Sequence, residues 1–215
     1  MPTATKPDRL DMKKRLKPLY APPTHPVLVE VPPLRYLMIG GALSEASAGF
    51  GVDPGFRDAI GSLYAVSYTL KFEAKTSGRD YVVMPLEGLF WTQGLEVLSR
   101  GEPRPTRWTL MILQPPWITR DSLTETVGRL VASGKLDRPP ALRLETLAER
   151  QAAQILHVGP YAEEPPTIEK LHAFIEEQDL VPRSKHHEIY LSDPNRTPPE
   201  RLKTVIRQPV RTRNE

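Results

Sequence analysis

The segment KHHEIYL at residues 185–191 carries the side chains best suited to chemistry in this sequence. Its alternation predicts a strand whose apolar face is formed by His187, Ile189 and Leu191. The other face carries His186, Glu188 and Tyr190. We expect the apolar face to pack against helices, which leaves Glu188 on the open face of the sheet. A carboxylate beside an aromatic ring can act there as a general base or as the counter-charge of a cation.

A second segment, DYVVMPLEGLFWT at residues 80–92, predicts another strand with Glu87, Leu89 and Trp91 on one face. Together the two strands predict a pocket in which carboxylates lie beside aromatic rings. Such a pocket suits hydrophobic or cationic aromatic small molecules. The alternative is an ordinary polar face of an antiparallel sheet, on which Glu and Tyr are common.

Other patterns of metal-binding or cofactor-binding residues are incomplete. Glu169 and His172 have the i, i+3 spacing of a metal-binding helix, but the sequence holds no second such pair. His186 and His187 are adjacent on a strand and therefore point to opposite faces. The glycine-rich segment 49–55 lacks the strand that directly precedes a dinucleotide loop. Cysteine is absent, which removes thiolate metal sites and thiol nucleophiles. We therefore expect no cofactor and no metal.

The composition is that of a globular protein of 215 residues. Lys and Arg number 29 against 26 Asp and Glu, and this small excess does not indicate nucleic-acid binding. The basic run KKRLK at 13–17 is short. No apolar run reaches the roughly 18–20 residues of a membrane span, and the N-terminus does not resemble a signal peptide. We expect a cytoplasmic protein that binds neither nucleic acid nor membranes, and its oligomeric state stays open.

Hydrophobic periodicity predicts the elements that position these residues. Strands are expected at 27–41, 80–92, 106–114, 185–191 and 202–210, and the segment 141–158 is expected to contain another. Helices are expected at 55–72, after a Ser122–Glu125 capping box, and at 166–179. The 24 prolines fall at the ends of these elements, which argues against disorder. In the charged segment before residue 27, we expect Leu16, Leu19 and Tyr20 to dock while residues 1–10 move freely.

The order strand, helix, strand, strand occurs twice along the chain, and Gln-Pro closes each copy at Gln114-Pro115 and Gln208-Pro209. We infer an α+β fold in which duplicated β-α-β-β units form one curved antiparallel sheet. Helices should cover its convex face, with a ligand groove on the concave face. The predicted organisation is an N-terminal arm at 1–26 and a single domain at 27–215. That domain divides into repeat one at 27–115, an inserted helix at 119–134 and repeat two at 141–210.

Several stretches of the sequence resemble the GyrI-like small-molecule-binding family, specifically its stand-alone members. They include DPGFRDAIGSLYAVSYTLKF, MPLEGLFW, GPYAEEPPTIEKLHAFI and HHEIYLSDPNRTPPERLKTVIRQPV, of which the last is the most specific. The resemblance spans about residues 10 to 210 and implies the duplicated fold described above. Family members serve as effector-binding domains of multidrug-responsive activators and as a gyrase inhibitor. Some stand-alone members hydrolyse cyclopropane-bearing, DNA-alkylating compounds.

The resemblance also implies roles for individual residues. By the HHEIYLSDP match, Glu188 corresponds to the family's pocket glutamate and is the expected catalytic residue. By the EGLFW match, Trp91 corresponds to a pocket aromatic residue. Tyr161 and Trp117 either border the groove or pack internally, and Tyr190 and Glu87 complete the expected ligand-binding set.

These expectations lead to three functional hypotheses. The favoured one is a detoxifying hydrolase in which Glu188, its pKa raised by apolar surroundings, activates a water that opens a cyclopropane ring. The second is a non-catalytic module that sequesters or senses ligands. The third is a gyrase-inhibitor-like interaction protein that uses its surface. Direct transcription activation is not expected, because we find no helix-turn-helix before the domain.

Overall fold

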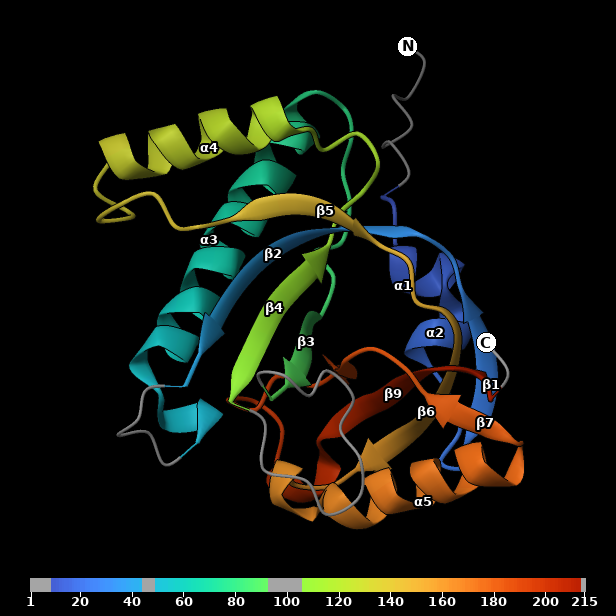
Figure 1. The fold of residues 1–215 in the computed structure, drawn as a ribbon. Helices are drawn as coiled ribbons and strands as arrows, with labels where there is room; N and C mark the ends of the chain where they lie inside the picture. Colours follow the sequence, from blue (N-terminus) through green and yellow to red (C-terminus); the bar gives the residue numbers. More distant parts are fainter. Residues whose placement is uncertain (1–8, 44–48, 93–105, 214–215) are drawn as a thin grey trace.

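The computed structural model describes residues 9–43, 49–92 and 106–213, which form five α-helices and nine strands (Figure 1). The helices are α1 (Met12–Arg15), α2 (Lys17–Tyr20), α3 (Pro54–Thr76), α4 (Arg120–Ala132) and α5 (Pro165–Glu177). The strands of the first half are β1 (Val27–Val31), β2 (Leu34–Ala42), β3 (Leu86–Trp91) and β4 (Arg107–Leu113). The others are β5 (Arg143–Leu147), β6 (Arg150–Val158), β7 (Leu180–Pro182), β8 (His186–Tyr190) and β9 (Lys203–Thr212). The α+β class is confirmed.

All pairings between these strands are antiparallel, in the order β1-β6-β9-β8-β3-β4-β2-β5, and β7 adds to β9. At the centre of the sheet, β3 pairs with β8. Outward from this pair, the strand order β4 then β2 on one side matches β9 then β6 on the other. The duplicated arrangement is therefore confirmed. The halves also exchange strands, because β1 pairs with β6 and β5 pairs with β2.

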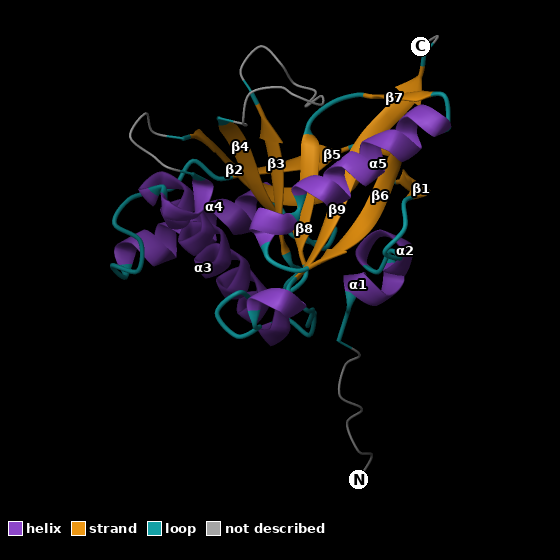
Figure 2. Cartoon of the chain, turned by 90° about the horizontal axis from the view of Figure 1, so that it is seen from below, coloured by secondary structure: helices purple, strands orange, loops and turns teal. Residues whose placement is uncertain are grey.

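The long helices α3 and α5 lie on the same face of the sheet, as the duplication requires (Figure 2). Phe56 of α3 packs against Phe90 of β3 with ring centroids 6.4 Å apart. Leu171 and Ile175 of α5 pack in one buried cluster with Ile206 of β9. The strand register puts Ile206 and Phe90 on one face, since Ile206 pairs with Glu188 and Glu188 with Gly88.

The short helices α1 and α2 lie against the opposite face. Leu19 and Tyr20 are buried there and Leu16 is partly buried in the same core, so the expected docking of these three residues is confirmed. Residues 1–8 lie outside the described part of the chain. The cavity described below lies on the other face, between α3 and α5, and not opposite these two helices as we expected.

Some element boundaries differ from the expected ones. The strand predicted at 80–92 begins only at Leu86, because residues 80–82 instead make backbone hydrogen bonds with Leu10. Proline lacks an N–H, and the strand predicted at 27–41 breaks at Pro32-Pro33 into β1 and β2. The capping box of α4 is formed by Thr119 and Ser122, one turn earlier than the predicted Ser122–Glu125 pair.

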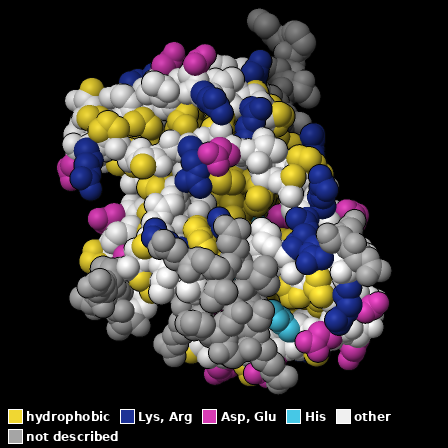
Figure 3. Space-filling view, in the orientation of Figure 1, with side chains coloured by type: hydrophobic (Ala, Val, Ile, Leu, Met, Phe, Trp, Pro, Cys, Tyr) yellow, Lys and Arg dark blue, Asp and Glu magenta, His cyan; other side chains and the backbone are white. Residues whose placement is uncertain are grey.

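On the face shown in Figure 3, Lys and Arg side chains are interspersed with acidic ones. Among the described residues, no helix is both long enough and apolar enough to cross a bilayer.

Candidate ligand cavity and active site

A cavity of about 1100 Å³ lies between α3 and α5, over the central strands β3 and β8. It is large enough for a drug-sized molecule. One wall comes from α3 through Phe56, Ile60, Tyr64 and Tyr68. The opposite wall comes from the start of α5 and the turn before it, through Tyr161, Glu164, Ile168, Glu169 and His172. The sheet contributes Leu86, Phe90, His186, Glu188 and Tyr190.

A glycine shapes the part of the sheet beneath this cavity. Gly88 pairs with Glu188 at the centre of the sheet. A Cβ at this position would lie 2.6 Å from the ring of Phe90, closer than van der Waals contact allows. Because glycine has no side chain, the Phe90 ring can lie against the backbone of β3 and present an apolar surface to the cavity.

Glu188 contributes a carboxylate to the cavity from strand β8. Its carboxylate accepts a 2.7 Å hydrogen bond from the Tyr190 hydroxyl, and its other oxygen lies 3.3 Å from Nε2 of His186. The side chain is 16% exposed, so a ligand in the cavity can reach it. Burial alone would raise the pKa of Glu188, but the contacts with His186 and Tyr190 outweigh it and lower that pKa. The expectation of a raised pKa was therefore wrong, and Glu188 is ionised at neutral pH.

Glu164 is a second carboxyl group in the cavity, with the opposite shift. It is 5% exposed and precedes α5 as its N-cap residue. Burial, together with the negative charge of Glu188, raises the pKa of Glu164 to about 8. At neutral pH the cavity therefore holds one ionised and one protonated carboxyl group, which is the arrangement of a general base with a general acid.

Two of the sequence-predicted aromatic residues line the cavity beside Glu188. The rings of Tyr161 and Tyr190 meet edge to face, with centroids 5.6 Å apart. Burial, with the nearby charges of Glu164 and Glu188, raises the pKa of Tyr161 to about 12, so its hydroxyl stays protonated. The role of these residues in binding stays a prediction.

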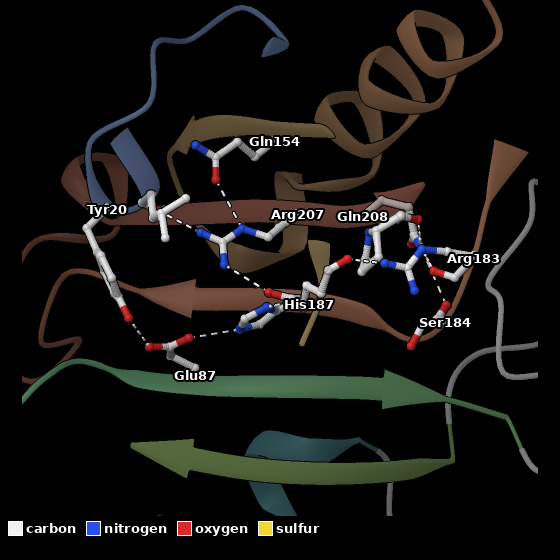
Figure 4. Close-up of polar contacts among 11 residues, drawn as sticks. Tyr20, Glu87, Gln154, Arg183, Ser184, His187, Arg207 and Gln208 are labelled. Carbon is white, nitrogen blue, oxygen red and sulfur yellow. Dashed lines mark hydrogen bonds and ion pairs between the residues drawn. The ribbon is translucent and has the colours of Figure 1, made fainter. Parts of the chain in front are cut away.

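The structure separates Glu87 from the cavity. Strand alternation places it on the face that carries α1 and α2, where it is completely buried. Its carboxylate accepts a hydrogen bond from Tyr20, and its second oxygen lies 3.0 Å from Nε2 of His187. His187 also contacts Glu149, which is ion-paired with Arg207. Figure 4 shows Tyr20, Glu87, His187 and Arg207 in this network. Glu87 thus belongs to a closed network beneath the arm and does not line the ligand site.

The two predicted tryptophans also lie outside the cavity lining. Trp91 lies on the same face as Glu87, and the Nζ atom of Lys185 lies 3.7 Å from its ring centroid. Trp117 packs edge to face against Tyr81, with centroids 6.3 Å apart. Of the two alternatives left open for Trp117, internal packing is the one observed.

Sequence reasoning missed several residues of the site, chiefly Glu164, His172 and the aromatic residues of α3. One feature of the sequence could have identified Glu164. It is an acidic residue directly before Pro165-Pro166, at the start of a predicted helix. Phe56 and Ile60 recur at helical spacing within the helix expected at 55–72, a pattern that by itself indicates only a helix with one apolar face. Whether these side chains line a cavity depends on the distance between α3 and α5. The spacing of apolar residues along one helix gives no information on that distance.

Comparison with protein families gives one match, in which a model of the GyrI-like small molecule binding domain aligns with residues 121–211. This segment extends from α4 to β9 and includes both Glu164 and Glu188. A search of proteins with reviewed function gives no match.

Solved structures match over nearly the whole chain. An uncharacterized conserved protein from Listeria innocua is 32% identical, with a TM-score of 0.83, and the match covers 94% of this chain and all of the other. A hydrolase from Listeria innocua is also 32% identical, with a TM-score of 0.80 over 95% of this chain and all of the other. The EcmrR C-terminal domain, at 11% identity and a TM-score of 0.54 over 87% of this chain and 98% of the other, shares the fold alone.

Proposed function

Because the chain belongs to the GyrI-like small-molecule-binding family, we propose that its cavity binds planar, apolar small molecules and hydrolyses those that carry a strained cyclopropane. The observation that carries this proposal is the ionised Glu188 carboxylate, held by Tyr190 and His186 within an aromatic cavity. The similar hydrolases from Listeria innocua support a hydrolytic role.

The proposed reaction uses Glu188 as the general base. Aromatic side chains such as Tyr64 and Phe90 orient the planar ligand. Glu188 accepts a proton from water as the water oxygen bonds to a cyclopropane carbon. The ring C–C bond breaks, and its electron pair moves into the conjugated system to which the ring is attached. A DNA-alkylating electrophile becomes an alcohol, which is the chemistry of detoxification.

The test is incubation of the protein with cyclopropane-bearing alkylators, followed by chromatography and mass spectrometry of the ring-opened product. Glu188→Gln should lower turnover by about 10²–10⁴, the usual contribution of a positioned base. Affinity for neutral ligands should change little, because Gln has nearly the same size. Glu177→Gln, at an exposed carboxylate outside the cavity lining at the end of α5, is the matched control and should retain activity. Absence of product from the unchanged protein would refute the hydrolase proposal.

A second candidate function is binding without catalysis. It is favoured by the combination of aromatic walls with the anionic Glu188, which suits a cationic aromatic ligand. In that case Glu188→Gln should weaken cationic ligands by about 1–2 kcal/mol and leave neutral ligands unaffected. The gyrase-inhibitor-like alternative requires no contribution from Glu188, and the same variant would leave it unchanged.

A further inference from the structure

Among the described residues, Oε1 of Glu164 makes no hydrogen bond of standard geometry, although the Thr204 hydroxyl is close enough to act on the pKa of this carboxyl group. Its Oε1 atom is buried, although the side chain lines the cavity. A buried polar atom left without a partner destabilises a protein by roughly 1–3 kcal/mol. Such an atom at the wall of a ligand cavity indicates a partner that the ligand supplies.

The helix that follows Glu164 does not explain the carboxyl group. An acidic N-cap residue ordinarily accepts hydrogen bonds from the first N–H groups of its helix. Here the first two positions of α5 are Pro165 and Pro166, which have no N–H, and the side chain of Glu164 makes no capping hydrogen bond. The carboxyl group is thus left available to the cavity.

We propose that Glu164 is the general acid of ring opening, which donates its proton to a carbonyl oxygen of the bound ligand. This proposal rests on the proposed hydrolase function and completes its proton balance. As water bonds to the cyclopropane carbon, Glu188 accepts a proton from that water and the ring C–C bond breaks. The electron pair of the broken bond moves through the conjugated system to the carbonyl oxygen, which takes the proton of Glu164. The product carries one new alcohol and one new enol or phenol. Proton exchange with solvent then restores both carboxyl groups.

The protonation states required by this step agree with the surroundings of the two groups. Glu164 is protonated at neutral pH because burial and the charge of Glu188 raise its pKa to about 8. The same cavity is lined by further titratable groups, which are Lys13 of α1, Tyr64 and Tyr68 of α3, Glu169 and His172 of α5, His186 and Tyr190 of β8, and Asp193. Tyr161 lies beside them, and its raised pKa keeps it neutral.

The assignment restricts the class of substrate. The ligand must place a strained ring near Glu188 and a conjugated carbonyl oxygen near Glu164. A cyclopropane without a conjugated carbonyl group should bind through the aromatic walls and remain intact.

The pH dependence of turnover tests the role of Glu164 with a cyclopropyl dienone as the probe. For the unchanged protein, kcat should fall as pH rises through about 8, because the acid loses its proton. Glu164→Gln should lower kcat by about 10²-fold or more and remove this alkaline decline. Glu163→Gln, at the neighbouring exposed residue, is the matched control and should retain both the rate and the decline.

A second measurement does not depend on turnover. Titration of the ¹³C-labelled Glu164 carboxyl in the free protein should give a pKa near 8. In Glu188→Gln this pKa should fall, because the negative charge that adds to the effect of burial is removed.

The outcomes separate the two proposals. Full turnover and an unchanged alkaline decline in Glu164→Gln, or a Glu164 pKa below 6 in the unchanged protein, would overturn the general-acid assignment and leave the hydrolase function standing. A failure of the unchanged protein to open any cyclopropyl dienone would overturn both.

Discussion

The hydroxyl of Tyr20 donates a 2.6 Å hydrogen bond to Oε1 of the completely buried Glu87, and so joins α2 to the central strand β3. The other oxygen of Glu87 contacts His187, so each carboxylate oxygen has one side-chain partner. This bond lies on the face of the sheet opposite the ligand cavity. Its loss should therefore affect stability without changing the ligand site.

Tyr20→Phe should lower the free energy of unfolding by about 1–3 kcal/mol, because it leaves one buried carboxylate oxygen without its donor. Urea denaturation would measure the change. Tyr68→Phe, at a tyrosine that is 47% exposed, is the control for loss of a hydroxyl and should change stability by less than about 0.5 kcal/mol. Equal stability of both variants would show that Tyr20 contributes no net energy through this bond.

The network around His187 should make stability depend on pH. Burial alone would lower the pKa of His187, but Glu149 and Glu87 outweigh it and raise that pKa from 6.5 to about 9. Because the folded-state pKa is the higher one, this stabilisation is fully present below about pH 6.5. It is lost as pH rises through about 9, with a total on the order of 3 kcal/mol.

The acidic limit has the opposite sign. Burial would raise the pKa of Glu149, but His187 and Arg207 lower it from 4.5 to about 2. Its stabilisation is therefore present above about pH 4.5 and is lost as pH falls toward 2. Unfolding measured from pH 3 to 10 should show both declines. His187→Gln should abolish the alkaline one, and its persistence in that variant would contradict the assignment.

Gly88→Ala should disturb the cavity through Phe90. The new methyl group would lie 2.6 Å from the Phe90 ring, which must then move away from β3 and into the space for the ligand. We expect about tenfold weaker binding of a planar ligand and a loss of stability of about 1–3 kcal/mol, as for overpacking in a core. Calorimetric titration and thermal unfolding would measure the two effects.

Gly61→Ala is the matched control for this change. Gly61 lies within α3, and a Cβ there meets no atom within 4 Å. Alanine should stabilise the helix by roughly 0.5–1 kcal/mol and leave ligand affinity unchanged. If the two variants bind the planar ligand with equal affinity, the Phe90 ring tolerates the added methyl group without moving into the cavity.

A row of rings on α3 predicts a preference for elongated ligands. Tyr64, Tyr68 and Phe72 follow one another at intervals of one helical turn, with centroids 6.2 Å and 6.5 Å apart. The first two line the cavity, whereas Phe72 is 56% exposed. Phe72→Ala should weaken ligands with two linked planar units several-fold and leave single-unit ligands unaffected, because an aromatic pair contributes about 0.5–1.5 kcal/mol. Val158→Ala, at another exposed apolar residue, should affect neither class.

The periodicity of the sequence predicted most of the elements, the duplication and the alternation of β8 correctly, but it placed the long helices on the wrong face of β8. Glu188 faces the ligand cavity, as expected, but that cavity lies on the face that carries α3 and α5, whereas Ile189 faces α1 and α2. Because β8 lies at the centre of the sheet, both of its faces are covered, by α3 and α5 on one side and by α1 and α2 on the other. On a strand covered on both faces, a polar residue can lie on either face if a cavity or a charged partner is present there. The alternation of polar and apolar residues does not show which face has such a cavity or partner.

Glu87 shows why partners distant in sequence were not predicted. Its local pattern, a carboxylate followed by Leu89 and Trp91, resembles that around Glu188. What distinguishes the two is contact with Tyr20 and His187, which come from an N-terminal helix and from the other half of the chain. The limits of the domain and of its repeats stay a prediction.

The exchange of β1 and β5 between the halves has a consequence for folding. Most pairings of these two strands join residues far apart in the chain, such as Val27 with Gln154, and loop closure of this kind slows folding. Either half expressed alone would leave an edge of its sheet without a partner strand and prone to aggregation. Although the chain carries an internal repeat, it should therefore refold slowly and in a single cooperative transition, unlike a repeat protein whose units fold independently.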